Sequence, residues 1–217
     1  MTLLDDWSNI GQAPPRIKGK LLVGNETKNE IIEAGRKAMI AKSYNGVGLN
    51  EILTDAGVPK GSFYHFFKSK EELGVAVIEA SVSENTEHLR QALTNPKLSP
   101  LTRLEQYFIW ARDDINSREL RQECLICKLA LELSSLSEPL RLAVRQGWDQ
   151  WRSIMIDCLR EAQQAGEIDS AHDPEALAEF IVYSFEGAMI RVQVDNHIRP
   201  VNQFLHFVFQ VLLKHRS

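Results

Sequence analysis

Residues 49–67 decide the fold of this chain and read Leu-Asn-Glu-Ile-Leu-Thr-Asp-Ala-Gly-Val-Pro-Lys-Gly-Ser-Phe-Tyr-His-Phe-Phe. Apolar residues recur in its first half at the spacing of a helix with one apolar face, at Leu49, Ile52, Leu53 and Ala56. Gly57 has no Cβ and suits the point at which that helix ends. Pro59 suits the opening of a second helix, where its missing N–H costs nothing. The stretch therefore predicts two helices joined by a tight turn.

The second of these helices has two different faces. Its inward face holds Phe63, Phe66 and Phe67. Its outward face is left with Lys60, Ser62, Tyr64 and His65. Cationic, hydroxyl and aromatic-polar groups presented together suit contacts with the base edges and phosphates of duplex DNA. The alternative is an ordinary helical hairpin with a basic surface.

Residues 58–73 read Val-Pro-Lys-Gly-Ser-Phe-Tyr-His-Phe-Phe-Lys-Ser-Lys-Glu-Glu-Leu and resemble the DNA-binding domain of TetR-type repressors. The resemblance is dense from about Thr27 to Ile78. It implies a homodimer that grips palindromic operator DNA with two heads and releases it when a small effector acts on the body. In that family, positions matching Tyr64 and His65 commonly contact phosphates. The predicted DNA-binding residues are Thr27, Gly48, Asn50, Lys60, Gly61, Ser62, Tyr64, His65, Lys68 and Lys70.

These predicted contacts differ in their chemistry. The start of the first short helix, at residues 48–50, turns free N–H groups and the positive end of the helix dipole toward phosphate. Gly61 allows close approach of the backbone, because a Cβ there would meet the wall of the groove. Lys60 reaches a base edge or a phosphate, and Lys68 and Lys70 anchor the flanking backbone.

The charge of the chain is unevenly distributed. The net charge of −4 alone argues against a nucleic-acid-binding protein. Residues 15–70, however, hold ten Lys/Arg against five Asp/Glu, whereas residues 71–217 hold fifteen against twenty-two. A basic head on an acidic body steers DNA to one end of the molecule. The charge pattern therefore supports DNA binding independently of the resemblance.

Several other classes of protein are disfavoured. No apolar run is long enough to span a bilayer, and acids stand near the start where a secretory signal would carry bases, so we expect a cytoplasmic protein without a membrane partner. The three cysteines are too few for a disulfide scaffold. We find no nucleophile–base pair, metal-ligand spacing or phosphate loop, which predicts no enzyme activity, no metal and no cofactor. A helical enzyme acting on the effector is the weaker alternative.

Turn signals divide the chain into three parts. We predict a mobile basic arm at 1–24, a helix-turn-helix domain at 25–70 and an effector-binding and dimerisation domain at 71–217. Thr27 and Glu30 have capping-box spacing at the start of the first helix. The expected fold is all-α with about nine helices, the later ones at 70–93, 101–116, 122–135, 137–165, 174–194 and 200–214.

The last two predicted helices suit a dimer interface, as the resemblance implies. Small residues on the first of them permit close helix approach, and apolar residues on the second form a matching strip. The predicted interface residues are Phe180, Ser184, Gly187, Ala188, Arg191, Phe204, Phe207, Val208 and Val211. The alternative is that both strips are buried within their own subunit. Two-fold symmetry on a palindromic operator favours the dimer.

Four aromatic residues are candidates for an effector pocket: Tyr107, Trp110, Trp148 and Trp151. They lie on predicted helices that line the pocket in relatives. The alternative for each is a core aromatic. Glu186 and Arg191 are further candidates to supply charge to a pocket or an interface.

Residues 123–133 read Glu-Cys-Leu-Ile-Cys-Lys-Leu-Ala-Leu-Glu-Leu and resemble the matching segment of repressors that respond to N-ethylmaleimide, other electrophiles or acrylate. Cys124 stands near a helix N-terminus, and Lys128, four residues on, can favour its reactive thiolate. Modification there would change local volume and charge and move the heads. Glu123 opposes thiolate formation. Cys127 and Cys158 are alternative sensors, and a reversible effector with purely structural cysteines is the alternative mechanism.

Overall fold

The computed structural model describes residues 26–117, 125–133 and 137–214. Within these ranges the chain forms nine α-helices, one π-helix and no strand, which confirms the predicted all-α fold. The elements are α1 (Glu26–Lys42), α2 (Leu49–Ala56), α3 (Lys60–Phe66), α4 (Lys70–Leu93), α5 (Pro100–Ser117), α6 (Leu125–Leu133), α7 (Glu138–Gln164), α8 (Pro174–Asp195), α9 (Arg199–Leu205) and η1 (His206–Leu212). The predicted arm at 1–24 and the predicted sensor Cys124 lie outside the described residues.

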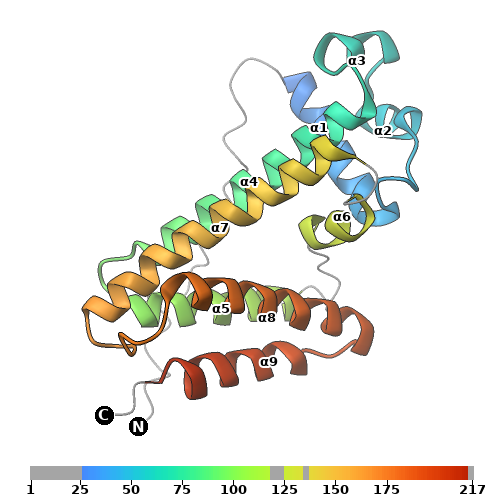
Figure 1. The fold of residues 1–217 in the computed structure, drawn as a ribbon. Coiled ribbons are helices and arrows are strands. Elements are labelled where there is room, and N and C mark those ends of the chain that lie inside the picture. The colour runs from blue at the N-terminus through green and yellow to red at the C-terminus, as the bar shows by residue number, and fades with distance from the viewer. Residues whose placement is uncertain (1–25, 118–124, 134–136, 215–217) are drawn as a thin grey trace.

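The helices α1, α2 and α3 form a head at one end of the molecule (Figure 1). Each contributes at least one large, fully buried side chain to a shared core: Ile31 and Met39 from α1, Ile52 from α2 and Phe63 from α3. Burial of such a side chain contributes roughly 1.5–3 kcal/mol relative to leaving it exposed. The apolar residues of 49–67 therefore assemble the head together with those of α1.

Two long helices, α4 and α7, run side by side from the head toward the far end of the body (Figure 1). Glycines let them approach closely. A Cβ on Gly147 of α7 would collide with the side chain of Val82 of α4, and one on Gly74 of α4 would lie 2.9 Å from a methyl carbon of Leu140. The two helices therefore pack tightly along their length.

The body core lies at the end opposite the head and is built on aromatic rings. Phe108 of α5 meets Phe185 of α8 and Phe204 of α9 edge-on, with ring centroids 5.0 and 4.9 Å apart. All three side chains are buried. Such edge-to-face pairs add to the stabilisation from burial alone. They join α5 to α8 and α9, and α8 and α9 run side by side (Figure 1).

The buried cluster of the head continues beyond residue 70. Val77 of α4, Leu129 of α6 and Leu140 of α7 are fully buried in the same cluster as the side chains of α1 to α3. The predicted domain boundaries stay a prediction. The helix α6 nevertheless packs on the head, although it follows α5 of the body in the chain.

One predicted helix cap and one predicted helix differ from the structure. The helix α1 already includes Glu26, so Thr27 lies in its first turn and is not the capping residue that its spacing with Glu30 predicts. The single helix predicted at 200–214 is α9 followed directly by the π-helix η1. A change from α- to π-helical winding alters which side chains share a face, and helical periodicity alone does not reveal it.

Candidate nucleic-acid interface

The turn between α2 and α3 has the geometry that its residues predict. Gly57 ends α2 with φ of 67°, in the left-handed region that favours glycine. The N–H of Gly57 donates to the Thr54 carbonyl at 3.1 Å, and the N–H of Val58 donates to the Leu53 carbonyl at 3.0 Å. These bonds satisfy the last carbonyls of α2. Pro59 then caps α3 in an extended conformation, which sets the angle between the two helices.

The helix α3 turns a polar face to solvent. Lys60, Gly61, Tyr64 and His65 are exposed, and Ser62 is half-buried. The Tyr64 side chain is 55% exposed, although it is large and aromatic. Exposed aromatic and basic groups on one short helix are well placed to contact a duplex.

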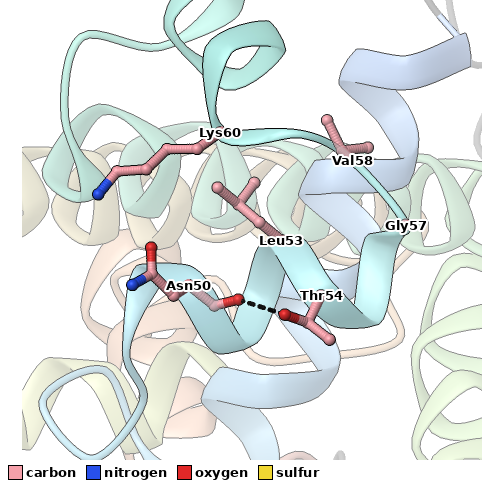
Figure 2. Close-up of a pocket in the computed structure, with 6 residues that line it drawn as sticks. All are labelled: Asn50, Leu53, Thr54, Gly57, Val58 and Lys60. Atoms are coloured by element: carbon pink, nitrogen blue, oxygen red, sulfur yellow. Dashed lines mark hydrogen bonds between the residues drawn. The ribbon is translucent and has the colours of Figure 1, made fainter.

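A shallow hollow of about 340 Å³ lies between α2 and α3 (Figure 2). Lys60 and Asn50 extend from the two helices on the same side of it (Figure 2). Thr54 also lines the hollow, and its hydroxyl donates to the Asn50 carbonyl at 2.8 Å. Thr54 was not among the predicted contacts, although its place one helical turn after Asn50 was a signal in the sequence. Amide, hydroxyl and ammonium groups at one rim suit contacts to phosphate or base edges.

Two predicted contact positions, Gly48 and Gly61, are open. A Cβ added at either glycine would meet no other atom within 4 Å in the described part of the chain. Gly48 is the N-cap of α2 in an extended conformation, and no side chain caps the amides of α2 among the described residues. Packing within the subunit therefore does not account for either glycine. Both positions leave room for the close approach of a partner.

The prediction for Lys70 needs a correction. We predicted that its ammonium contacts the DNA backbone, but in the structure the ammonium binds the backbone of the protein itself. Its Nζ donates to the carbonyl oxygens of Tyr44 at 2.6 Å and Val47 at 2.5 Å, and lies 4.4 Å from the centre of the Tyr44 ring. Burial lowers the pKa of Lys70, and the nearby carboxylate of Glu132 opposes that shift. Lys70 therefore secures the loop between α1 and α2.

The two remaining predicted contacts lie at the edges of the head. Thr27 is half-buried in the first turn of α1, and Lys68 is exposed between α3 and α4. The backbone N–H of Lys68 donates to the carboxylate of Glu72 at 2.6 Å, which fixes the backbone from which the lysine side chain extends. The roles of Thr27 and Lys68 on DNA stay predictions.

Family matches cover both the head and the body. Residues 31–77 match the bacterial regulatory proteins of the tetR family, and residues 100–208 match the tetracyclin repressor-like C-terminal domain. The chain belongs to the TetR family. Members of this family are DNA-binding regulators, and the open face of α3 lies within the residues that match its N-terminal model.

Individual relatives extend the TetR-family match over nearly the whole chain. The transcriptional regulator AcuR of Cereibacter sphaeroides is 36% identical over 214 residues, which cover 96% of this chain and 98% of AcuR. The repressor DhaR of Mycobacterium sp. (strain GP1) is 32% identical, over 86% of this chain and 92% of DhaR. The crystal structure of reduced Escherichia coli NemR has a TM-score of 0.76 at 26% identity, over 86% of this chain and 97% of NemR. The chain is thus a TetR-type transcriptional repressor and not an enzyme.

The interface strip expected of a TetR-family dimer is only partly exposed. Phe180 and Phe207 are 53% and 60% exposed, and Gly187, Arg191 and Val211 are exposed as well, whereas Ser184 is half-buried. The other three predicted interface residues need a correction, because they are buried in the core of their own subunit: Ala188, Phe204 and Val208. Burial between α8, α9 and η1 leaves them no surface for a second copy.

Three apolar residues missed by the prediction extend the exposed strip along α8. They are Tyr183, Ile190 and Val194. With Phe180 and Gly187 they follow the three- and four-residue spacing of one helix face, which was the signal in the sequence. We call Phe180, Tyr183, Gly187, Ile190, Val194, Phe207 and Val211 the apolar face of α8 and η1.

Three of the four predicted effector aromatics converge in the body. The Tyr107 ring lies 6.0 Å from that of Trp110 and 6.0 Å from that of Trp151. The prediction that groups Trp148 with these three residues needs a correction, because Trp148 packs against the buried cluster of the head. One helical turn along α7 therefore separates Trp148 from the aromatic group.

Several buried polar atoms of the body have no hydrogen-bond partner among the described residues. His88 of α4, which the sequence analysis missed, stacks on Trp110 at 5.9 Å. Within the described residues, His88 Nδ1, Gln106 Oε1 and Trp151 Nε1 are buried without a hydrogen-bond partner from the protein. A buried polar atom left unpaired costs roughly 1–3 kcal/mol. These atoms are candidates for contacts to a bound ligand.

A thiol, a carboxyl and an indole meet where α6, α7 and α8 come together. Cys127 is half-buried, and it and Trp148 both lie close to the Glu186 carboxyl. Burial raises the pKa of Glu186, and the neighbouring Trp148 and Cys127 oppose that shift. Of the two charged residues considered on α8, Glu186 thus faces inward, while Arg191 is exposed and pairs with Asp195 at 2.7 Å.

The side chains of Lys128 and Cys158, which were also predicted to take part in sensing, have other hydrogen-bond partners. The Lys128 ammonium, predicted to favour the Cys124 thiolate, donates to the carbonyl of Ile40 in α1. Lys128 therefore also contacts the head, and the predicted roles of Lys128 and Cys124 in sensing stay predictions. Cys158 is buried and donates to the Pro100 carbonyl at 3.2 Å. Burial raises the pKa of this thiol to about 12, which disfavours Cys158 as a reactive sensor.

The described ranges contain no group of three or more His, Cys, Asp or Glu side chains placed to hold a metal ion. None of the helices in those ranges is long and apolar enough to span a membrane.

Proposed function

We propose that this TetR-family repressor binds palindromic operator DNA as a homodimer in the cytoplasm, with α3 of each subunit in a major groove. The exposed polar face of α3, set on the buried Phe63 ring, carries the proposal. Lys60, Tyr64 and His65 contact the duplex from this face, and Lys68 contacts the flanking backbone. The excess of basic residues at 15–70 also supports the proposal that the head faces the DNA.

The apolar face of α8 and η1 is the proposed dimer interface. A single head of this size buries too little surface for tight specific binding, so two heads must act together. Contiguous exposed apolar side chains are a hallmark of interaction surfaces. Gly187 lies in the middle of the face, and a Cβ added there would have no neighbour within 4 Å among the described residues. This position therefore leaves room for a closely packed helix of the second subunit.

We propose that a small electrophile causes release of the operator by modifying a thiol of the segment that contains α6, with Cys124 as the first candidate. The resemblance of 123–133 to electrophile-responsive repressors supports this proposal. The contacts of α6 with both the head and α8 support it as well, because added volume at this segment would disturb them. Cys127 is the second candidate, since its half-buried thiol faces Glu186.

Reversible binding in the body is the second candidate mechanism. The group formed by Tyr107, Trp110 and Trp151 supports it, together with the unsatisfied atoms of His88 and Gln106. Such a site suits a small, flat molecule with hydrogen-bonding groups at its edge. In this case the cysteines are structural.

Fluorescence anisotropy tests these proposals with a labelled duplex from the promoter region of the protein's own gene. We expect binding by a dimer, with affinity that falls steeply as salt rises, because phosphate contacts release counterions. N-ethylmaleimide should release the duplex from the native protein but not from Cys124→Ser. Release from Cys124→Ser but not Cys127→Ser would assign the sensor to Cys127. Release that survives both substitutions would contradict the covalent mechanism.

A further inference from the structure

A carboxylate of the body holds a loop of the DNA-binding head. Glu132 of α6 accepts from the backbone N–H of Tyr44 at 2.9 Å through Oε2 and from that of Asn45 at 2.6 Å through Oε1. Tyr44 and Asn45 lie in the loop between α1 and α2, within the residues that match the tetR family domain. Glu132 lies within the match to the C-terminal domain. These two hydrogen bonds thus join the two parts of the protein.

The conformation of the loop explains why it accepts a carboxylate. Ser43 has φ of 69°, a left-handed conformation that is uncommon outside glycine. After such a residue, successive backbone N–H groups can point the same way and form a concavity that binds an anion. Tyr44 and Asn45 supply the two N–H groups, and each carboxylate oxygen of Glu132 accepts one of them. Charge-assisted hydrogen bonds of this type are stronger than neutral ones.

An opposite charge holds the same loop from α4. The Lys70 ammonium binds the carbonyl oxygens of Tyr44 and Val47, while Glu132 binds the neighbouring N–H groups. The carboxylate of Glu132 raises the pKa of Lys70 against the effect of burial, so the two charges stabilise each other across the loop. The loop is therefore fixed between α6 and α4, through both its donors and its acceptors.

The same face of α6 makes two further contacts with the head. Lys128 donates to the carbonyl of Ile40 near the end of α1, and Leu129 is fully buried in the head cluster. Lys128 and Glu132 are four residues apart, so they lie on one face of the helix. In Figure 1, α6 lies between the head and α8. It is thus the helix through which a change near Glu186 can reach the loop.

The loop leads directly to the predicted DNA contacts. Three residues after Asn45, Gly48 forms the N-cap of α2, and Asn50 lines the hollow between α2 and α3. Movement of the loop therefore moves the start of α2 and, through the Gly57 turn, the exposed face of α3. Misplacement of contact groups by even a fraction of a hydrogen-bond length weakens several contacts at once.

We propose that Glu132 is a positioning residue for operator binding: it docks the loop between α1 and α2 onto α6 and so holds the head at the angle that fits DNA. Displacement of α6 breaks its two hydrogen bonds and lowers operator affinity. This proposal rests on the proposed DNA-binding function of the head. Glu132 does not touch the duplex, and it acts through the loop.

The test compares Glu132→Gln and Glu132→Ala with Glu138→Gln in the full-length protein. Glu138 is an exposed carboxylate at the start of α7 that pairs with Arg141, so Glu138→Gln makes the same change of charge away from the loop. Each protein is titrated against the duplex from its own promoter region. We expect Glu132→Ala to lower affinity by at least about tenfold, Glu132→Gln to lower it less because its amide oxygen still accepts one bond, and Glu138→Gln to bind like the native protein.

Hydrogen exchange separates positioning from a general loss of structure. The amides of Tyr44 and Asn45 should exchange faster in Glu132→Ala, while those in the cores of α4 and α7 keep their native rates. Global unfolding of the near-isosteric Glu132→Gln would overturn the proposal, because Glu132 would then be a residue of general stability. Native affinity in a folded Glu132→Ala would overturn it as well.

Tyr64→Ala serves as the reference for the proposed function. Loss of binding in Tyr64→Ala together with native binding in Glu132→Ala would reject only the positioning role. Native binding in Tyr64→Ala would instead reject the assigned face of α3, whatever Glu132→Ala does.

Discussion

The ring of Tyr64 stands edge-on against the ring of Phe63, with centroids 5.2 Å apart and planes inclined at 76°. Phe63 is fully buried, whereas Tyr64 is largely exposed. One neighbour thus anchors α3 in the head core and supports the other at the surface. A rigidly supported aromatic residue can contact a duplex with little loss of conformational freedom.

Tyr64→Ala should lower operator affinity by about tenfold or more, because both the ring and the hydroxyl are lost from the contact face. The unfolding temperature should change little, since the side chain lies outside the core. Anisotropy titration and thermal unfolding measure the two effects. Tyr64→Phe separates the hydroxyl from the ring. Unchanged affinity in Tyr64→Ala would remove this residue from the interface.

Gly61→Ala should bind DNA at least about tenfold more weakly and yet be as stable as the native protein or up to about 1 kcal/mol more stable, because alanine favours helix. Its Cβ meets no atom within 4 Å in the described part of the chain, so only a partner can exclude it. Gly57→Ala is the contrasting variant: its φ of 67° predicts lower stability. If Gly61→Ala binds normally, the backbone at Gly61 does not approach the duplex closely.

Lys70→Met should destabilise the protein by roughly 1–3 kcal/mol, because it leaves two carbonyl groups of the loop without their donor. Lys68→Met removes the same charge from an exposed side chain, so it should keep native stability and weaken DNA binding. Denaturant unfolding and salt-dependent titration distinguish the pair. The assignment fails if Lys70→Met unfolds like the native protein and lowers only the salt dependence of binding.

Phe207→Glu should convert the dimer to a folded monomer, because it places a charge in the apolar face of α8 and η1. Leu142→Glu introduces the same charge at an exposed leucine of α7 outside that face and should leave the dimer intact. Sedimentation velocity reports the mass of each variant, and circular dichroism reports its helix content. A native-like dimer of Phe207→Glu would place the interface elsewhere.

Cys158 should resist N-ethylmaleimide near neutral pH in the folded protein, because burial raises the pKa of its thiol from 9.0 to about 12 and the thiolate is the reactive form. A raised folded pKa also means that this thiol contributes stability below pH 9.0 that is lost as the pH rises toward about 12. Peptide mass spectrometry before and after denaturation measures the labelling. Rapid labelling of Cys158 in the native state would contradict its burial.

Much of the architecture could be predicted because it depends on neighbours in the chain. The apolar spacing at Ile52 and Leu53, the left-handed Gly57 and the proline at residue 59 specify the helix-turn-helix locally, and the structure has these elements where the residues place them. The prediction was less accurate where helix winding changes, as at η1, because strong helical periodicity does not distinguish α from π hydrogen bonding.

The sequence by itself determined the order of the helices, the basic head and the polar face of α3, since all of these follow from residue type and spacing. Only the tertiary structure decided which groups the charged ends of long side chains contact. Lys70 and Glu132 meet the same loop although 62 positions separate them in the chain, and Phe204 is buried while Phe207 is exposed. Such outcomes depend on which helices pack together, and a local pattern carries no record of its distant neighbours.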